Sequence, residues 1–464
     1  MADVDGKVRD WIADVTGGEV GDVVALPSGG RAGYFVDLLL DGSVHLLYLQ
    51  QGRGLEADAS SFQGAVTEAE VYRALRPHGI PVPRVWGVDG EHDLLLVDRV
   101  PGTVWFRAPA DVAQQEAVAK DFIAHLAGWH SLDAATLDLP SFGPVTSRRE
   151  HQIHQNTENE RTIRAGAGTR RLDPLVEWSI EWLRDNVPSS DGHVVLVQGD
   201  TGPGNFLYEG SKVTGIIDWE LAHLGDPMDD IAWLSWRAIQ HGFPDFPQRM
   251  REYEQKSGEL VDEARVLYYR LNAFTRLGPW FGLADMGEPN PYHDAIHDPR
   301  NIRAADGSVL IFATLHRRMR IEATAAAWGI ELPPREVLID GVVRDHAAMY
   351  DRILEQLSII AAESGDRGAS SLAKGVARQV KYLKEVDRFG NSFDEIERDE
   401  IGALLGSVST DLKVARTALL AAARAGRVER DDYLKYHWHR VVRDDHLMRT
   451  ASGAVYDRSW PALA

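Results

Sequence analysis

The chain has 464 residues, with 50 Lys and Arg against 70 Asp and Glu, which gives a formal net charge of −20. This length predicts two or three domains with hydrophobic cores of their own and excludes a small scaffold held together by disulfides. An acidic surface repels phosphate backbones and anionic lipids, so we expect no nucleic-acid and no membrane partner. The absence of cysteine excludes disulfides, thiolate metal sites and a cysteine nucleophile.

The N-terminus is charged and amphipathic, whereas a signal peptide needs an unbroken apolar stretch. No window of about 18 apolar residues occurs, so no segment is expected to span a bilayer. We therefore expect a soluble, cytoplasmic protein that acts on a small molecule.

The first hundred residues alternate apolar runs with turn residues. Apolar spacing predicts a short helix within residues 1–20. Strands are expected in three runs, 23–40, 41–51 and 93–100, with a hairpin turn at Asp41-Gly42. Residues 67–79 have a threonine cap, an acidic first turn and a terminal glycine, which is typical of a helix. An antiparallel sheet that carries one helix follows from this order.

The pattern becomes helical from about residue 111, with one β-rich segment at 193–222. Helices resume after that segment and continue to the end of the chain. A flexible linker is expected at 363–371 and a loop near 388–392.

The β-rich segment contains the residues that suggest chemistry. Asp200 and Asn205 stand five apart in a Gly- and Pro-rich loop, and Asp218 ends the next strand. Such oxygen ligands suit Mg²⁺, which prefers one or two protein ligands together with substrate phosphates. A carboxylate beside the metal can orient an attacking hydroxyl and accept its proton. The loop alone is also typical of an ordinary turn, so its interpretation depends on Asp218, on the segment 221–227 and on the preceding β-rich region.

This ordered set resembles the catalytic loop and metal-binding strand of the aminoglycoside phosphotransferase and choline kinase superfamily, which are small-molecule kinases with a protein-kinase-like fold. The family's loop reads His-Gly-Asp, four variable residues and Asn, and its later strand ends in Asp. The resemblance runs from about residue 20 to 330 and includes the flanking segments 126–132 and 221–227. It implies Asp200 as the catalytic residue and Asn205 and Asp218 as Mg²⁺ ligands. Asp226 is expected to cap a helix.

The resemblance also implies an ATP site in the N-terminal lobe. A Gly-rich loop would cover the phosphates, a helix glutamate would pair with the phosphate-binding Lys, and the strand that ends near Val100 would border the adenine. The cofactor-binding residues implied in this way are Ser28, Gly29, Gly30, Arg31, Gln50, Glu68, Asp98 and Val100.

Two positions depart from the family pattern. Gln50 stands where the family has Lys or Arg, so one charge that offsets phosphate is missing unless Arg31 or Arg53 supplies it. Gln198 stands where the family has a His that braces the loop, a role that Gln can also fill. The first departure is what a catalytically silent, nucleotide-binding pseudokinase would show.

The acceptor site of the family lies among the helices after the catalytic loop. Here residues 268–301 are rich in aromatic side chains, which favours an apolar, aromatic or acyl acceptor, although core packing also explains such residues. The aromatic residues are Tyr268, Tyr269, Phe274, Trp280, Phe281 and Tyr292. His293 and His297 have the spacing of metal ligands, but two bracketing prolines favour other roles.

We therefore expect an α+β, two-lobed protein-kinase-like fold with an appended α-helical domain. Its parts would be a β-rich N-lobe at 1–103, a mainly helical C-lobe at 104–335 and the appended domain at 340–464. The expected function is ATP- and Mg²⁺-dependent phosphorylation of a hydroxyl group on a small molecule. The appended domain has no catalytic motif, and the sequence leaves open whether it caps the acceptor pocket, forms a homodimer or binds a partner protein. A scaffold acting through it is the second alternative.

Overall fold

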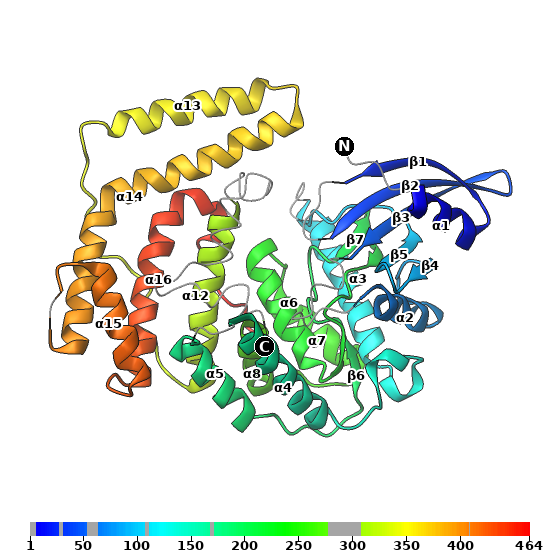
Figure 1. Ribbon diagram of the computed structural model, residues 1–464, viewed down its shortest axis with the longest axis horizontal. Helices are drawn as coiled ribbons and strands as arrows, with labels where there is room; N and C mark the ends of the chain where they lie inside the picture. The colour runs from blue at the N-terminus through cyan, green and yellow to red at the C-terminus, as the bar shows by residue number, and fades with distance from the viewer. Residues whose placement is uncertain are drawn as a thin grey trace. The chain divides into compact units, whose positions relative to one another are not determined.

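The computed structural model describes residues 6–26, 31–52, 64–106, 111–167, 171–276, 308–407 and 409–464 (Figure 1). The chain divides into two compact units. The first comprises 1–162, 187–270 and 459–464, and the second comprises 163–186 and 271–458. The division into three parts at residues 103 and 340 stays a prediction. Among the described residues, no helix is both long enough and apolar enough to cross a membrane.

The first unit begins with a five-stranded antiparallel sheet in the order β1-β2-β3-β5-β4. Its elements are α1 (Gly6–Thr16), β1 (Glu19–Ala25), β2 (Ala32–Leu40), β3 (Ser43–Gln51), α2 (Ala65–Leu75), β4 (Val85–Asp89) and β5 (Leu94–Asp98). The Asp41-Gly42 turn is confirmed, because Leu40 pairs with Ser43 and both turn residues have positive φ. Strand β4 was not predicted, since a five-residue run that contains glycine gives little periodic signal.

The two faces of this sheet have different functions. Leu47, Leu49, Leu94 and Leu96 form one core with Ile12 of α1. Gln50 lies directly opposite Leu95 in the antiparallel register, and paired residues share a face, so Gln50 lies on the other side of the sheet from this core. Helix α2 packs against β4 and β5. The register therefore places Gln50 toward the helix that carries Glu68.

The rest of the first unit is mainly helical and contains two small β-ribbons. Strand β6 pairs with β9, and β7 pairs with β8. The elements are α3 (Val112–His130), α4 (Arg148–Ala167), β6 (Val195–Val197), β7 (Phe206–Glu209), β8 (Lys212–Ile216), β9 (His223–Gly225), α6 (Met228–His241), α7 (Phe246–Ser257) and α8 (Glu263–Arg276), of which α4 and α8 extend into the second unit. Loop 198–205 joins β6 to β7, and residues 217–222 join β8 to β9.

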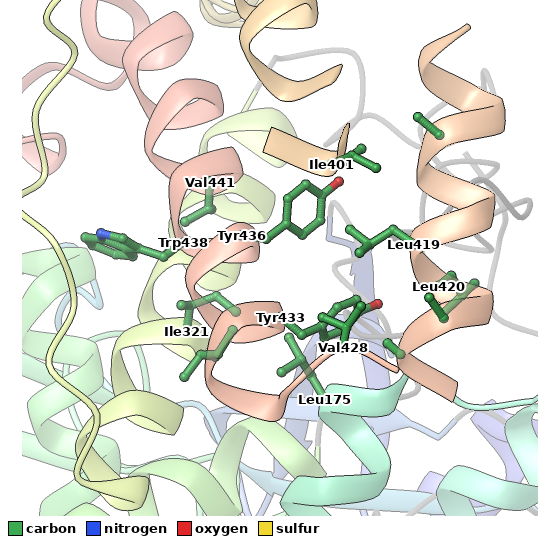
Figure 2. Close-up of a cluster of buried hydrophobic side chains, with 14 of the residues drawn as sticks. Leu175, Ile321, Ile401, Leu419, Leu420, Val428, Tyr433, Tyr436, Trp438 and Val441 are labelled. Atoms are coloured by element: carbon green, nitrogen blue, oxygen red, sulfur yellow. The ribbon is translucent and has the colours of Figure 1, made fainter. Parts of the chain in front are cut away.

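The second unit is helical. Its further elements are α5 (Pro174–Asp185), α12 (Ser308–Trp328), α13 (Ala347–Glu363), α14 (Arg367–Leu405), α15 (Leu412–Arg424) and α16 (Arg430–Ser452). Figure 2 shows its core, in which Tyr433 and Tyr436 of α16 lie among Leu175, Ile321 and Leu419 from neighbouring helices. This unit confirms the prediction of additional helical structure toward the C-terminus, and the fold class is α+β, as expected.

Two expected interruptions of this helical region are wrong. Only residues 364–366 separate α13 from α14, because Asp366 caps α14 by accepting hydrogen bonds from the N–H groups of Gly368 (2.6 Å) and Ala369 (3.2 Å). The expected loop at 388–392 is helical. Phe389 and Phe393 are buried one turn apart with ring centroids at 5.5 Å, and their burial holds the helix together through the intervening glycine.

Candidate active site

A buried carboxylate on α6 holds the predicted catalytic loop. Asp230 accepts hydrogen bonds from the backbone N–H groups of Gln198 and Gly199, each at 2.9 Å, and from the hydroxyl of Thr201. The Nε2 atom of His130 lies 3.0 Å from the same carboxylate. Burial alone would raise the pKa of Asp230, but these hydrogen bonds outweigh it and hold the pKa below its ordinary value.

Glycine is required where the loop passes close to other backbone and side chains. Gly199 has φ +81° and lies so near the carbonyl of Leu221 that an added Cβ would be 2.4 Å from the oxygen. Gly202 has φ +132°, and its Cβ would be 2.9 Å from the Cβ of Arg237 on α6. The loop therefore follows a path that other residues could not adopt without strain.

This path brings the predicted catalytic residue Asp200 and the predicted metal ligand Asn205 together. The side-chain nitrogen of Asn205 donates to the backbone oxygen and to the carboxylate of Asp200, both at 2.8 Å. Gln198 donates from its side chain to the carbonyl of Ile217 at 2.7 Å, and Ile217 donates its N–H to the carbonyl of Asn205 at 2.9 Å. The loop is thus tied to the residue that precedes Asp218.

Asp218 itself has φ +62°, which is strained for a residue with a side chain. Burial raises its pKa, and the carboxylates of Glu68 and Asp200 add to this effect, while Arg31 opposes it. The N–H of Trp219 donates to Glu68 at 3.2 Å, which connects this turn to α2. The strained turn is therefore held from both sides.

Arg31 joins the predicted nucleotide and metal residues. Its guanidinium forms ion pairs with Glu68 (2.9 Å), Asp218 (2.6 Å) and Glu220 (3.1 Å). Burial would lower the pKa of Arg31, but these three carboxylates raise it instead. The side chain of Gln50 donates to Glu68 at 2.9 Å, so the residue at the expected Lys position contacts the expected glutamate.

Glu68 is fully buried, and Tyr72 on the next helical turn donates to it at 2.8 Å. Burial would raise the pKa of Glu68, but Arg31, Gln50 and Tyr72 together lower it. An ionised, buried carboxylate is tolerated only with such partners. Arg31 and Gln50 are therefore both needed by the structure around Glu68.

Asp200 has a partner that the sequence did not suggest. Arg237 on α6 donates from Nε to one carboxylate oxygen at 2.8 Å and contacts the other through a terminal nitrogen. Arg237 and Asp230 belong to no motif recognisable in the sequence, because each lies 29 or more residues from its partners in the loop. The one usable hint was the position of Asp230 near the start of a predicted helix directly after the motif.

Other predicted residues contact residues outside this cluster or lie outside the described residues. The carboxylate of Asp98 accepts from the indole of Trp86 at 2.7 Å, and Val100 lies against Gly215 of β8. Asp226 accepts from the N–H of Met228 at 2.9 Å at the beginning of α6, as expected of a cap. Residues that lie outside the described ranges are Ser28, Gly29, Gly30, Arg53, Trp280, Phe281, Tyr292, His293 and His297.

The polar set at the loop is small. It consists of the carboxylates of Asp200 and Asp218 and the amide of Asn205. Arg237 pairs with Asp200, and Arg31 pairs with Asp218. Within the described residues, no group of three or more His, Asp or Glu side chains is arranged to hold a metal ion. The roles predicted for the individual residues stay predictions.

Comparison with known proteins shows which proteins this chain resembles. Residues 55–267 match the phosphotransferase enzyme family. The chain is 28% identical over 178 residues to acyl-CoA dehydrogenase family member 11 of Rattus norvegicus, which covers 36% of this chain and 22% of that protein. It is 25% identical over 240 residues to hygromycin-B 4-O-kinase of Escherichia coli, which covers 47% of this chain and 66% of that protein. The matched segment thus spans about a fifth of the dehydrogenase relative.

A solved structure of a putative aminoglycoside phosphotransferase from Ralstonia eutropha aligns with 70% of this chain and 98% of its own, at 18% identity and a TM-score of 0.49. Over residues 55–267, the chain is similar to the phosphotransferase enzyme family. This match confirms the resemblance found in the sequence.

The bracing role of Asp230 predicts a specific loss of stability. Asp230→Asn replaces a charged acceptor by an amide whose nitrogen faces N–H donors, and it should lower the free energy of unfolding by about 2–4 kcal/mol at pH 7. Urea unfolding measures this loss, and Asp111→Asn, the same change at an exposed cap, is the control.

The pH dependence of this difference has a definite sign. A lowered folded-state pKa stabilises the protein above the unfolded pKa of about 3.9, and this stability is lost as the pH falls through the folded value. The difference in free energy of unfolding between the parent and Asp230→Asn should be constant from about pH 7 to 5 and should decrease below about pH 4. A gap that widens in acid contradicts the assignment.

Proposed function

We propose that the protein is an ATP- and Mg²⁺-dependent phosphotransferase that phosphorylates a hydroxyl group of a small molecule. The observation that carries the proposal is the convergence of Asp200 and Asn205 in loop 198–205 with Asp218 in the connection 217–222, beside the Arg31–Glu68 ion pair. The family match over residues 55–267 supports it independently. A screen of hydroxyl compounds for ADP release from ATP tests it directly.

The donor set at the loop fits Mg²⁺. The Asn205 nitrogen is committed to Asp200, so the Asn205 oxygen and the Asp218 carboxylate are the atoms that would hold the ion. Mg²⁺ binds such oxygens together with substrate phosphates, and when bound it offsets the negative charge of the phosphoryl group. Asp200 would orient the acceptor hydroxyl and accept its proton.

Arg31 would supply the phosphate-site cation that position 50 lacks. It follows the expected Gly-rich loop directly in the chain and pairs with Glu68, the partner expected for the family's Lys. A guanidinium presents several donors in a fixed fork, which suits phosphate oxygens. The cation is then relocated rather than lost, and the pseudokinase alternative loses its main support.

An acceptor with an apolar or acyl part stays our proposal. The names of the acyl-CoA dehydrogenase relatives support an acyl acceptor, whereas the name of hygromycin-B 4-O-kinase points to a sugar-based one. Tyr268 and Tyr269 of α8 are buried, and ordinary core packing explains their burial as well as an acceptor site does. The cytoplasmic location, and dimer or partner contacts of residues 340–464, remain expectations.

The metal role of Asp218 predicts a loss of Mg²⁺-dependent nucleotide binding. Asp218→Ala leaves only the neutral Asn205 oxygen, so the enhancement of ATP affinity by Mg²⁺ should fall about tenfold or more. Calorimetric titration with and without Mg²⁺ measures it. Glu220→Gln is the matched control, because it removes another carboxylate from Arg31 without touching the proposed ligands. If both variants lose the Mg²⁺-dependent gain in ATP affinity to the same extent, Asp218 is not a metal ligand.

The catalytic role of Asp200 predicts a different pattern. Asp200→Asn is isosteric and cannot accept a proton, so turnover should fall by about two orders of magnitude or more while nucleotide affinity is retained. ADP release with an accepted hydroxyl compound measures turnover, and calorimetry measures affinity. Turnover at the parent rate would refute the mechanism.

Relocation of the cation predicts a rescue. Arg31→Ala should weaken ATP binding about tenfold, because it removes a charge-assisted contact to phosphate. Gln50→Lys alone should give little gain, since Arg31 already pairs with Glu68. The double variant Arg31→Ala/Gln50→Lys should recover most of the affinity. If Gln50→Lys alone raises affinity and Arg31→Ala has no effect, the position is truly vacant.

A further inference from the structure

One helix face brings two basic side chains to the predicted catalytic loop. Arg237 and His241 lie one turn apart on α6. A Cβ at Gly204 would lie 3.4 Å from a terminal guanidinium nitrogen of Arg237 and 3.7 Å from Nε2 of His241. Both side chains therefore border the 202–204 part of the loop, beside Asp200.

Arg237 has donors left after it pairs with Asp200. That pair uses Nε and one terminal nitrogen, and the other terminal nitrogen is the one that borders Gly204. The side chains of Arg237 and Asp200 are each 19% exposed, so a ligand can reach both. A guanidinium so held is ordered in advance and loses little side-chain freedom when it binds an anion.

The charge beside Asp200 indicates which acceptors fit. A polycationic acceptor would be repelled by Arg237 and would require carboxylates in its place. A carboxylate or a phosphate matches the guanidinium fork and would share it with Asp200. We propose that the acceptor carries an anionic group close to the hydroxyl that is phosphorylated, and that Arg237 binds this group with His241 beside it. This inference rests on the proposed phosphotransferase function and narrows its acceptor.

Matched acceptors test the inference. One set has a common alkyl skeleton. It consists of β-hydroxyoctanoate, its methyl ester, the amino alcohol in which an aminomethyl group replaces the carboxylate, and the phosphate monoester in which a phosphorylated hydroxymethyl group replaces it. A second set repeats these head groups on an aromatic skeleton. With the full-length protein, ATP and Mg²⁺, the kcat/KM of an anionic member should exceed that of its ester about tenfold or more, and the amine should be the poorest acceptor. The carboxylate and the phosphate arms distinguish the two anions.

Variants separate acceptor binding from support of Asp200. Arg237→Gln should raise KM for the anionic acceptor about tenfold or more. It should bring the ratio of kcat/KM for the anionic acceptor to kcat/KM for its ester close to one. Arg237→Lys keeps the charge but not the fork, so its ratio should be intermediate. Arg251→Gln on α7 makes the same charge change at an exposed position and should leave the ratio unchanged. A purely structural role for Arg237 would instead lower kcat for all acceptors in the same proportion.

The possible failures are distinguishable. Equal or better transfer to the ester or the amine, or a proportional loss for all acceptors in Arg237→Gln, overturns this inference and leaves the proposed function intact. If no acceptor in either set gives more ADP release with the parent protein than with Asp200→Asn, the proposed function is wrong. This inference then fails with it.

Discussion

The carboxylate of Asp230 accepts two backbone hydrogen bonds and a hydroxyl hydrogen bond from loop 198–205 and is braced by His130 of α3. The loop contains glycines at positive φ and has no regular partner strand of its own, so its shape depends on this buried acceptor. Arg237 follows Asp230 by seven residues, or two helical turns, and so emerges on the same face of α6. The helix that fixes the loop therefore also brings a cation to Asp200.

The second constraint is the buried Glu68. Because a carboxylate without partners is too costly to bury, the folded state requires the donors of Arg31, Gln50 and Tyr72. Arg31 extends this requirement to Asp218, which it contacts at 2.6 Å. The β-rich lobe and the Asp218 turn are thus coupled by electrostatics, and a neutral residue at position 50 is tolerated because Arg31, which directly precedes β2, supplies the charge.

The sequence was sufficient for features that are local. Apolar runs and turn residues located most strands of the sheet, and the spacing of Asp200, Asn205 and Asp218 located the loop. It was insufficient for contacts between distant segments. Arg31 and Asp218 are 187 residues apart, and no local sequence pattern around either residue indicates that they pair. The continuity of α14 was missed for a related reason, since burial of Phe389 against other helices overrides the local tendency of glycine to break a helix.

Under the proposed function, a chain with a net charge of −20 would bind a nucleotide that is itself an anion. Long-range steering opposes this binding, so the affinity must come from local cations. Arg31 and Arg237 are only 14% and 19% exposed, and each is held by carboxylates. Their charges are therefore positioned before any ligand arrives, and an anionic ligand that reaches them meets donors that are already held in place.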